Sequence, residues 1–366
     1  MSIIIFITSL AILITVHEFG HFIAAKKSGI RVDEFGLGFP PKLWSKKWGE
    51  TLYTLNAIPF GGFVKIFGED LHITVISEED KPRSFFYKSK WIQALVLVAG
   101  VAMNIIFAWL LISLGFVIGL PNSVEHDGFG IVTNAHVVIV DVLPASPAEK
   151  LGLHVGDTIL SASTKKDTLQ GAELNRENLQ HFIAESNSKN INITYSRGNS
   201  LPSVINIEPN TDIIPGKKAI GVAMDDIGIL KLPVHLALIE GARTTGFLIQ
   251  ATATGLGTFF WNVLTLKADF SQVSGPIGIA SVVGQARSLG FVYLISLMAL
   301  ISINLAIINL LPFPALDGGR LLFVGIEAII RRPIPASFVR SINTIGFSLL
   351  LIFMLVVTTQ DILKLL

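Results

Sequence analysis

Two histidines and a glutamate lie within five consecutive positions, in the segment His17-Glu-Phe-Gly-His21. Residues four apart on an α-helix lie about 40° apart around its axis, so both imidazoles can reach one ion. Glu18 lies beside them, where it can take a proton from a water molecule that such an ion activates. The pattern predicts a catalytic zinc site with His17 and His21 as ligands and Glu18 as general base.

A third ligand is needed, because catalytic zinc usually has three protein ligands and one open position. The chain has no cysteine, which excludes thiolate ligands and disulfides. The other six histidines lie outside the long apolar segments, so we expect a carboxylate in or near one of these segments. The candidates are Glu240, Asp269, Asp317, Glu327 and Asp361.

The elements that must position this cluster are strongly apolar. Of the 366 residues, 51% are hydrophobic and only 15% are charged, against about 25% charged residues in soluble domains. This composition excludes a disordered chain and argues against a single soluble globule. The net charge of +1 gives no indication of nucleic-acid binding. The composition therefore indicates an integral membrane protein.

Four segments are long and apolar enough to cross a bilayer, which takes about 20 residues. The first contains His17, Glu18 and His21, and ionisable residues in a span are costly and hence candidates for function. We expect a permanent helix there and no cleaved signal peptide, because Lys26 and Lys27 follow the apolar run. The four predicted spans are Ile3–Ala25, Trp91–Leu120, Phe291–Leu311 and Phe338–Val357.

The charges of the connecting loops predict the orientation. Residues 26–90 contain 11 Lys or Arg and 8 Asp or Glu, whereas residues 121–231 contain 9 and 13. By the positive-inside rule the first loop is cytoplasmic and the second is extracytoplasmic, as are both termini. A fifth apolar segment, Thr244–Leu264, has many Thr and Gly residues and aromatic residues near its end, so it fits a helix lying at the membrane interface.

Asp317 is the candidate that this topology favours. With four spans, the third helix ends on the cytoplasmic side, level with His17 and His21. If Thr244–Leu264 also crossed, Asp317 would lie on the opposite surface of a core about 30 Å thick. Asp317 also follows two prolines that break the helix and precedes two glycines that permit close backbone approach. A common metal site therefore requires four spans and an interfacial fifth segment.

The loop regions predict two further features. Residues Asp127–Pro209 are expected to form an extracytoplasmic domain with strands at Gly130–Thr133, His136–Val142, Ile191–Tyr195 and Val204–Ile207 and a helix at Asn175–Glu185. Its segment Val142–Leu160, with Gly-Leu-His-Val-Gly-Asp-Thr-Ile-Leu at its end, resembles the PDZ-domain signature. Such a domain could bind an extended peptide or exclude bulky substrates, and both roles remain open.

The first cytoplasmic loop is expected to form a membrane-associated β-hairpin. Its strands would be Thr51–Ile58 and Phe60–Phe67, on either side of Pro59. An edge strand beside the metal could hold an unwound substrate through backbone hydrogen bonds, or the hairpin could simply pack against the helices.

Together these motifs resemble the site-2 proteases, which are zinc metalloproteases that cut within membranes. The likeness covers nearly the whole chain and rests on His17–His21, Gly100-Val-Ala-Met-Asn104, the PDZ-like domain and Asn309–Gly318. Ser274–Ile279 further resembles the bacterial branch that regulates sigma-E (RseP-like). Many Gram-negative members carry two tandem PDZ domains, whereas residues 121–231 have room for one.

The resemblance implies cleavage of transmembrane segments of single-span membrane proteins, such as anti-sigma factors or remnant signal peptides. The setting would be regulated intramembrane proteolysis in the bacterial inner membrane, in contact with lipid, often after a first protease. It implies that His17, His21 and Asp317 bind Zn²⁺ and that Glu18 is the base. Asn309 would position the substrate or stabilise the oxyanion. Asn104 would do the same or pack helices together.

The expected fold is a polytopic α-helical membrane protein with four transmembrane helices, an inserted PDZ-like α+β domain and a membrane-associated β-hairpin. Expected regions are 1–120 with the first two spans and the hairpin loop, 121–231 with the PDZ-like domain, 232–290 with interfacial helices, and 291–366 with the last two spans. Two alternatives stay open. One is a membrane-anchored metalloprotease of soluble substrates, and the other is a non-enzymatic PDZ scaffold or metal transporter.

Overall fold

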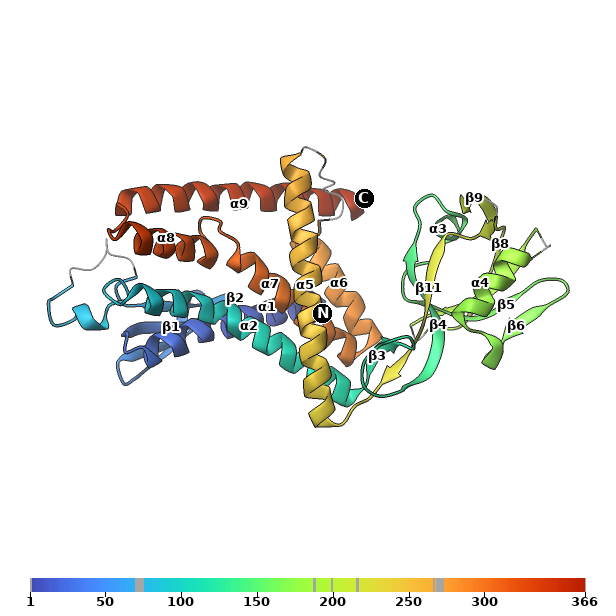
Figure 1. The fold of residues 1–366 in the computed structure, drawn as a ribbon, viewed down its shortest axis with the longest axis horizontal. Coiled ribbons are helices and arrows are strands. Elements are labelled where there is room, and N and C mark those ends of the chain that lie inside the picture. Colours follow the sequence, from blue (N-terminus) through green and yellow to red (C-terminus); the bar gives the residue numbers. More distant parts are fainter. Residues whose placement is uncertain are drawn as a thin grey trace. The chain divides into compact units, whose positions relative to one another are not determined.

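The computed structural model describes residues 2–69, 76–186, 189–198, 200–214, 217–265, 267 and 273–365. The chain divides into two compact units, which we call the helical unit (Met1–Ser113 with Gly241–Leu366) and the β unit (Leu114–Glu240). Figure 1 shows their elements coloured along the chain. Each unit is described by itself.

Four helices are long and apolar enough to cross a membrane. They are α1 (Ser2–Lys27), α2 (Lys90–Ile118), α7 (Phe291–Leu310) and α9 (Ala336–Leu365). They coincide with the four predicted spans, which are confirmed as to number and place among the described residues. In α9 only 11% of the apolar window is buried in the protein. So much exposed apolar surface requires an apolar solvent, which fits a multi-pass membrane protein.

Two further helices of the helical unit follow the β unit along the chain. Helix α5 (Val234–Leu264) is one continuous helix of 31 residues that contains the predicted interfacial segment. It is not among the helices that are both long and apolar enough to cross a membrane, and its place at the membrane interface stays a prediction. Helix α6 (Pro276–Leu289) begins within the Ser274–Ile279 motif and packs against α1 and α7.

The first loop forms a sheet, but not the predicted hairpin. Strand β1 (Val32–Trp48) and strand β2 (Thr51–Ile66) are joined by a turn at Gly49, whose φ of 62° is left-handed. The prediction of two strands that meet at Pro59 was therefore wrong. Proline cannot donate a ladder hydrogen bond and is accommodated at an irregularity, and here Pro59 lies in a register break within the single strand β2.

The register of this sheet doubles back on itself. Residues 34–37 of β1 have Cα partners at 52–55 on one side and at 62–65 on the other, and residues 44–48 pair with 51–55. The segment 62–65 is therefore at the edge of the sheet. Strand β2 packs against α1, so this edge lies beside the helix that carries His17, Glu18 and His21.

An interruption between two helices positions Asp317, the candidate third ligand. Helix α7 ends at Leu310, and α8 (Asp317–Ile330) begins after an irregular segment that contains the two prolines. A Cβ atom at Gly318 would lie 2.5 Å from the Leu310 carbonyl carbon, and one at Gly319 would lie 2.8 Å from the Phe313 carbonyl carbon. Glycine is therefore required for the close return of the chain at the first turn of α8.

The β unit is built on a seven-stranded sheet. Its strand order is β3-β11-β4-β5-β7-β8, with β6 paired to β5, and a separate pair is formed by β9 and β10. The buried core includes Ile139, Ile159, Leu179 and Ile193. Helix α4 (Arg176–Glu185) is capped by the Asn175 side chain, which accepts a hydrogen bond from the Asn178 N–H group. The short helix α3 (Pro147–Lys150) is capped in the same way by Ser146.

The strand bounds correct two expectations for this unit. Gly130–Thr133 and His136–Val142 are not separate strands, because β4 runs from Val132 to Val142 through a bulge where Asn134 has a φ of 52°. The sheet also extends past Pro209, because β11 (Val222–Leu230) lies between β4 and β3 (Leu120–Ser123). The other strands are β5 (Asp157–Ser163), β6 (Thr168–Gln170), β7 (Ile191–Arg197), β8 (Ser203–Ile207), β9 (Asn210–Ile214) and β10 (Lys217–Ala219).

Candidate metal centre

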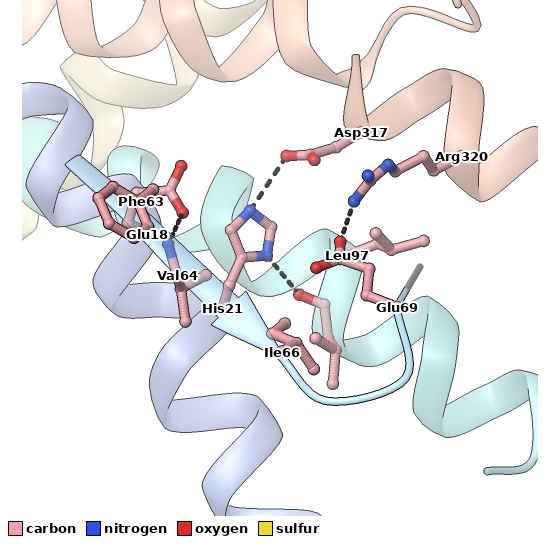
Figure 2. A pocket seen from close by; sticks show the side chains of 10 residues that line it. Glu18, His21, Phe63, Val64, Ile66, Glu69, Leu97, Asp317 and Arg320 are labelled. Carbon is pink, nitrogen blue, oxygen red and sulfur yellow. Dashed lines mark hydrogen bonds and ion pairs between the residues drawn. The ribbon is translucent and has the colours of Figure 1, made fainter. Parts of the chain in front are cut away.

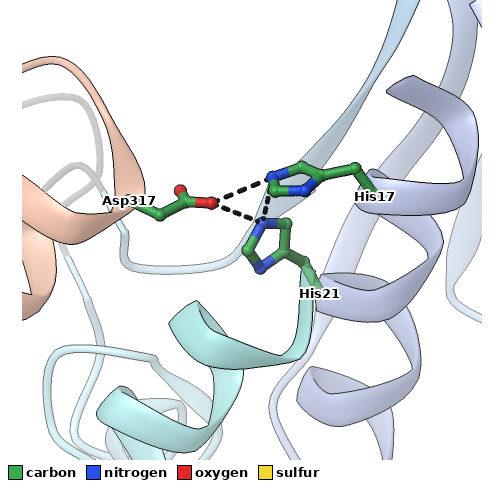
Figure 3. Close-up of side chains that lie close together, drawn as sticks. All are labelled: His17, His21 and Asp317. Atoms are coloured by element: carbon green, nitrogen blue, oxygen red, sulfur yellow. Dashed lines mark hydrogen bonds and ion pairs between the residues drawn. The ribbon is translucent and has the colours of Figure 1, made fainter. Parts of the chain in front are cut away.

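Three side-chain atoms converge in the helical unit, as Figure 3 shows. His17 Nε2 lies 2.9 Å from Asp317 Oδ2, and His21 Nε2 lies 3.2 Å from the same oxygen. The two Nε2 atoms are 3.1 Å apart. The structure thus brings together His17 and His21 of α1 with Asp317, which lies 296 residues after His21 in the chain.

This triangle has the dimensions that a metal ion requires. Zinc binds imidazole nitrogen and carboxylate oxygen at about 2.0–2.1 Å, so the edge of its tetrahedron is about 3.3 Å. The three observed separations are slightly shorter, and two neutral imidazoles with one carboxylate are a donor set that suits zinc. The residues present therefore fit a zinc ion with one open coordination position.

The charge of Asp317 suits the same site. Burial by itself would raise the pKa of its carboxyl group, but the neighbouring imidazoles of His17 and His21 outweigh that effect and hold the pKa below its ordinary value. The carboxylate is therefore ionised at neutral pH. Both histidines are buried, with 6% of each residue exposed, so the site is shielded from water on the side of α1.

Glu18 lies beside the triangle and faces the sheet edge. Its Oε2 atom accepts a hydrogen bond from the Val64 N–H group at 3.1 Å, which ties α1 to the edge segment of β2 (Figure 2). Glu18 lines a cavity of about 240 Å³ together with His21, Asp317 and Arg320. Its carboxylate is thus held in place and reaches open space next to the candidate ligands.

Asn309 lies near the same groups. It lines a second cavity, of about 210 Å³, with His17, Glu18 and Asp317. Asn104 is placed differently, because it is fully buried in α2. Its Nδ2 atom lies 3.3 Å from His17 Nδ1, and it is not among the residues that line these two cavities.

The other carboxylate candidates have different partners. Glu327 forms an ion pair with Lys90, with Nζ and Oε2 2.6 Å apart. Asp361 accepts hydrogen bonds from the backbone N–H groups of Gly275 and Gly278 at the start of α6. Glu240 belongs to the β unit, and Asp269 lies outside the described residues. Among the described candidates, only Asp317 joins the histidines.

Sequence reasoning missed several residues around this centre. Arg320 and Glu69 form an ion pair and line the first cavity (Figure 2). The spacing of Asp317 and Arg320, three residues apart and therefore on one helix face, was a signal for Arg320. The Val96 carbonyl oxygen of α2 also contacts the His21 imidazole, and a contact through a backbone atom cannot be predicted from the residue type.

Comparison with known proteins agrees with the zinc chemistry of the donor set. Residues 5–353 match the model of peptidase family M50. A protein of Clostridium perfringens, CPE1693, is 35% identical over 99% of this chain and 98% of its own length. A protein of Nostoc sp., all3971, is 36% identical over 99% of this chain and 96% of its own. Both are named zinc metalloproteases. The chain belongs to peptidase family M50, the site-2 proteases, and is a zinc-dependent metalloendopeptidase with several membrane-spanning helices.

Proposed function

We propose that His17, His21 and Asp317 hold the zinc ion and that Glu18 is the general base of peptide-bond hydrolysis. The observation that carries the proposal is the convergence of two Nε2 atoms and one Oδ2 atom within 3.2 Å of one another. These atoms come from two helices far apart in sequence. A buried pair of imidazoles at the edge of a cavity is costly without such a purpose.

A zinc ion bound there would acidify a water molecule and polarise the scissile carbonyl group. Glu18 would take a proton from the attacking water and give it to the departing amine. Its carboxylate is next to the cavity and has only one backbone partner among the hydrogen bonds described for it. The Asn309 amide lines the second cavity beside His17. From there its N–H group can donate to the developing oxyanion.

We further propose that the substrate is a transmembrane segment of a single-span membrane protein, such as an anti-sigma factor or a signal-peptide remnant. The candidate site lies within α1, an apolar helix of 26 residues. A substrate helix must unwind before its backbone can be cut. The edge segment 62–65 lies next to Glu18, and its backbone groups can pair with the unwound strand.

The position in the cell follows from the same proposal. The excess of basic residues in 26–90 supports a cytoplasmic first loop, with the β unit and both termini on the extracytoplasmic face of the inner membrane. The β unit, with its PDZ-like Gly152–Leu160 segment, would then control the access of substrates on the extracytoplasmic face. Its role is to exclude substrates that retain a bulky outer domain.

Cleavage of a membrane substrate by matched variants tests the catalytic proposal. Glu18→Gln keeps the shape of the side chain and removes the base, so cleavage of a single-span substrate in proteoliposomes should fall by about 10²–10⁴-fold. Zinc content should stay near that of the wild type. Glu173→Gln, on the exposed surface of the β unit, is the control and should cleave normally. Near-normal cleavage by Glu18→Gln would overturn the mechanism.

A soluble peptide with the same cleavage sequence tests the substrate class. If the enzyme acts on transmembrane segments, this peptide should be cut far more slowly than the membrane-embedded form. Equal rates would favour a membrane-anchored protease of soluble substrates.

A deletion variant based on the structure tests the proposed role of the β unit. Val124 N donates to Asp226 O at 2.8 Å, so a short glycine turn can replace residues 125–225 and keep β3 paired with β11. The proposed role predicts that this deletion permits cleavage of substrates with bulky outer domains and leaves trimmed substrates unaffected. If trimmed substrates are cut more slowly, the unit captures peptide termini instead.

A further inference from the structure

The Gly100–Asn104 motif of α2 lies directly behind the two candidate zinc ligands. Val96, Gly100 and Asn104 are spaced four residues apart, so they form one stripe along the helix. A Cβ atom at Gly100 would lie 2.7 Å from His21 Cε1 and 2.9 Å from His17 Cε1. Glycine at this position therefore gives both imidazoles the space in which they lie.

The same glycine opens a carbonyl group to His21. The Val96 oxygen lies 2.8 Å from His21 Nδ1. A carbonyl oxygen has two lone pairs, so it can accept this bond in addition to its helical one, provided that no side chain at Gly100 blocks the approach. The His21 Nδ1 proton is thereby fixed, which leaves Nε2 bare and directed at Asp317.

His17 meets Asn104 at the corresponding place. Its Nδ1 atom lies 3.3 Å from the Asn104 amide, and its Nε2 atom lies 2.9 Å from Asp317. Binding a metal through Nε2 requires the proton on Nδ1, and this proton needs an acceptor. An amide can present either its oxygen or its nitrogen, because a half-turn of the group exchanges them. The Asn104 Oδ1 atom is buried and has no partner among the described residues.

Asn104 is itself held in position. It is fully buried, and its backbone oxygen accepts a hydrogen bond at 2.9 Å from Ser302 Oγ of α7, a side chain that is also fully buried. This bond fixes the backbone of α2 at Asn104 against α7, so the side-chain amide starts from a fixed position beside His17.

We propose that Asn104 is a positioning residue that selects the metal-ready tautomer of His17. Its Oδ1 atom accepts the Nδ1 proton, while the Val96 carbonyl does the same for His21. The proposal rests on the assignment of both histidines as zinc ligands, and it gives Asn104 a role behind the ligands, with no contact to the substrate.

Zinc affinity of the purified full chain, measured by competition with a chelator, tests this role apart from turnover. Asn104→Ala should weaken zinc binding about 10–100-fold. Asn104→Asp keeps the acceptor and loses the donor, so it should bind zinc within a few-fold of the wild type. Ser113→Ala removes another polar group of α2, whose hydroxyl bonds only to Trp109 O among the contacts described for it, and should bind zinc normally.

Each outcome decides the question. Wild-type affinity in Asn104→Ala, or an equal loss in Asn104→Asp and Asn104→Ala, overturns the acceptor role. His17→Ala distinguishes failure of the ligand assignment from failure of the Asn104 proposal. If this variant binds zinc as tightly as the wild type, His17 is not a ligand. Nitrogen-15 spectra of histidine-labelled, zinc-loaded wild type need no variant. We expect His17 to bind through Nε2 with a proton on Nδ1, and coordination through Nδ1 would refute the proposal even if Asn104→Ala does not fold.

Discussion

The helical unit and the β unit each contain a carboxylate withdrawn from solvent within a glycine-rich motif, and the two are used differently. In the β unit, Asp157 of the PDZ-like segment is fully buried and receives two hydrogen bonds from Arg197, at 2.7 and 2.8 Å. The His154 N–H group supplies a third, at 2.9 Å. In the helical unit, Asp317 is partly exposed, and the partners described for it are two imidazoles that need their Nε2 lone pairs for an ion.

The difference shows how to distinguish a structural charge from a functional one. The hydrogen bonds to Asp157 already satisfy the carboxylate, and Arg197 also donates to the Gly152 carbonyl, which fixes the turn. Asp317 instead borders a cavity with Glu18 and Arg320. A buried charge whose partners are complete stabilises a fold, whereas donor atoms that converge at the edge of a cavity suit the binding of a central ion.

Removing Asp317 should produce the largest effect. Asp317→Ala deletes one of the three proposed ligand atoms, so zinc content should fall well below one ion per chain and cleavage should fall to background. Metal analysis and a cleavage assay measure both. Asp167→Ala, at an exposed turn of the β unit, is the control. Full zinc content in Asp317→Ala would remove this residue from the ligand set.

Gly100→Ala should give the next largest effect, because the added methyl group overlaps both imidazoles. We expect zinc affinity to fall at least about tenfold, through displacement of the rings. Gly325→Ala in α8, where a Cβ atom meets nothing within 4 Å, is the matched control in the chelator competition. Unchanged affinity in Gly100→Ala would mean that the rings do not occupy the positions described.

Arg197→Ala tests the other side of the comparison. It leaves Asp157 buried without its main partner, which costs on the order of 3 kcal/mol. Hydrogen exchange in the intact chain should therefore show faster exchange of β5 and β7, whereas zinc content should be unchanged. Loss of zinc without loss of protection in these strands would contradict the distinction between the two carboxylates.

An exposed carboxylate should have the smallest effect. Hydrogen bonds from Arg83 and Lys26 lower the pKa of Glu50, so its contribution to stability is present above the unfolded pKa and disappears as pH falls through the lower, folded value. Because Glu50 is a third exposed, Glu50→Gln should cost about 1 kcal/mol or less at pH 7. The difference from the wild type should begin to shrink in thermal unfolding as the pH falls below about 4.3, the ordinary pKa of Glu, and should vanish below the folded pKa. A larger loss of stability in Glu50→Gln would show that the exposure of a carboxylate does not predict its contribution to stability.

The spans and the candidate metal-binding pair were predictable because they depend on local patterns. Apolar runs of 20 or more residues give the four helices, and the spacing of His17 and His21 places both on one face. The strand pairing was predicted less well. Pro59 suggested a turn, but the partner of β2 is β1, and the bulge at Asn134 joined two expected strands into β4. A proline or a bulge indicates that the register changes, but it does not indicate which strand lies opposite.

The sequence by itself determined that two histidines lie on one face of an apolar helix and that a carboxylate is the expected third ligand, since these predictions follow from residue types and helical spacing. Only the tertiary structure decided that Asp317 meets His17 and His21, that Val64 ties Glu18 to a sheet edge, and that Gly100 and Asn104 stand behind the imidazoles. Those relations join segments as much as 300 residues apart. They depend on how helices pack and on which backbone groups remain available for hydrogen bonds. Neither property can be predicted from the local pattern of residues.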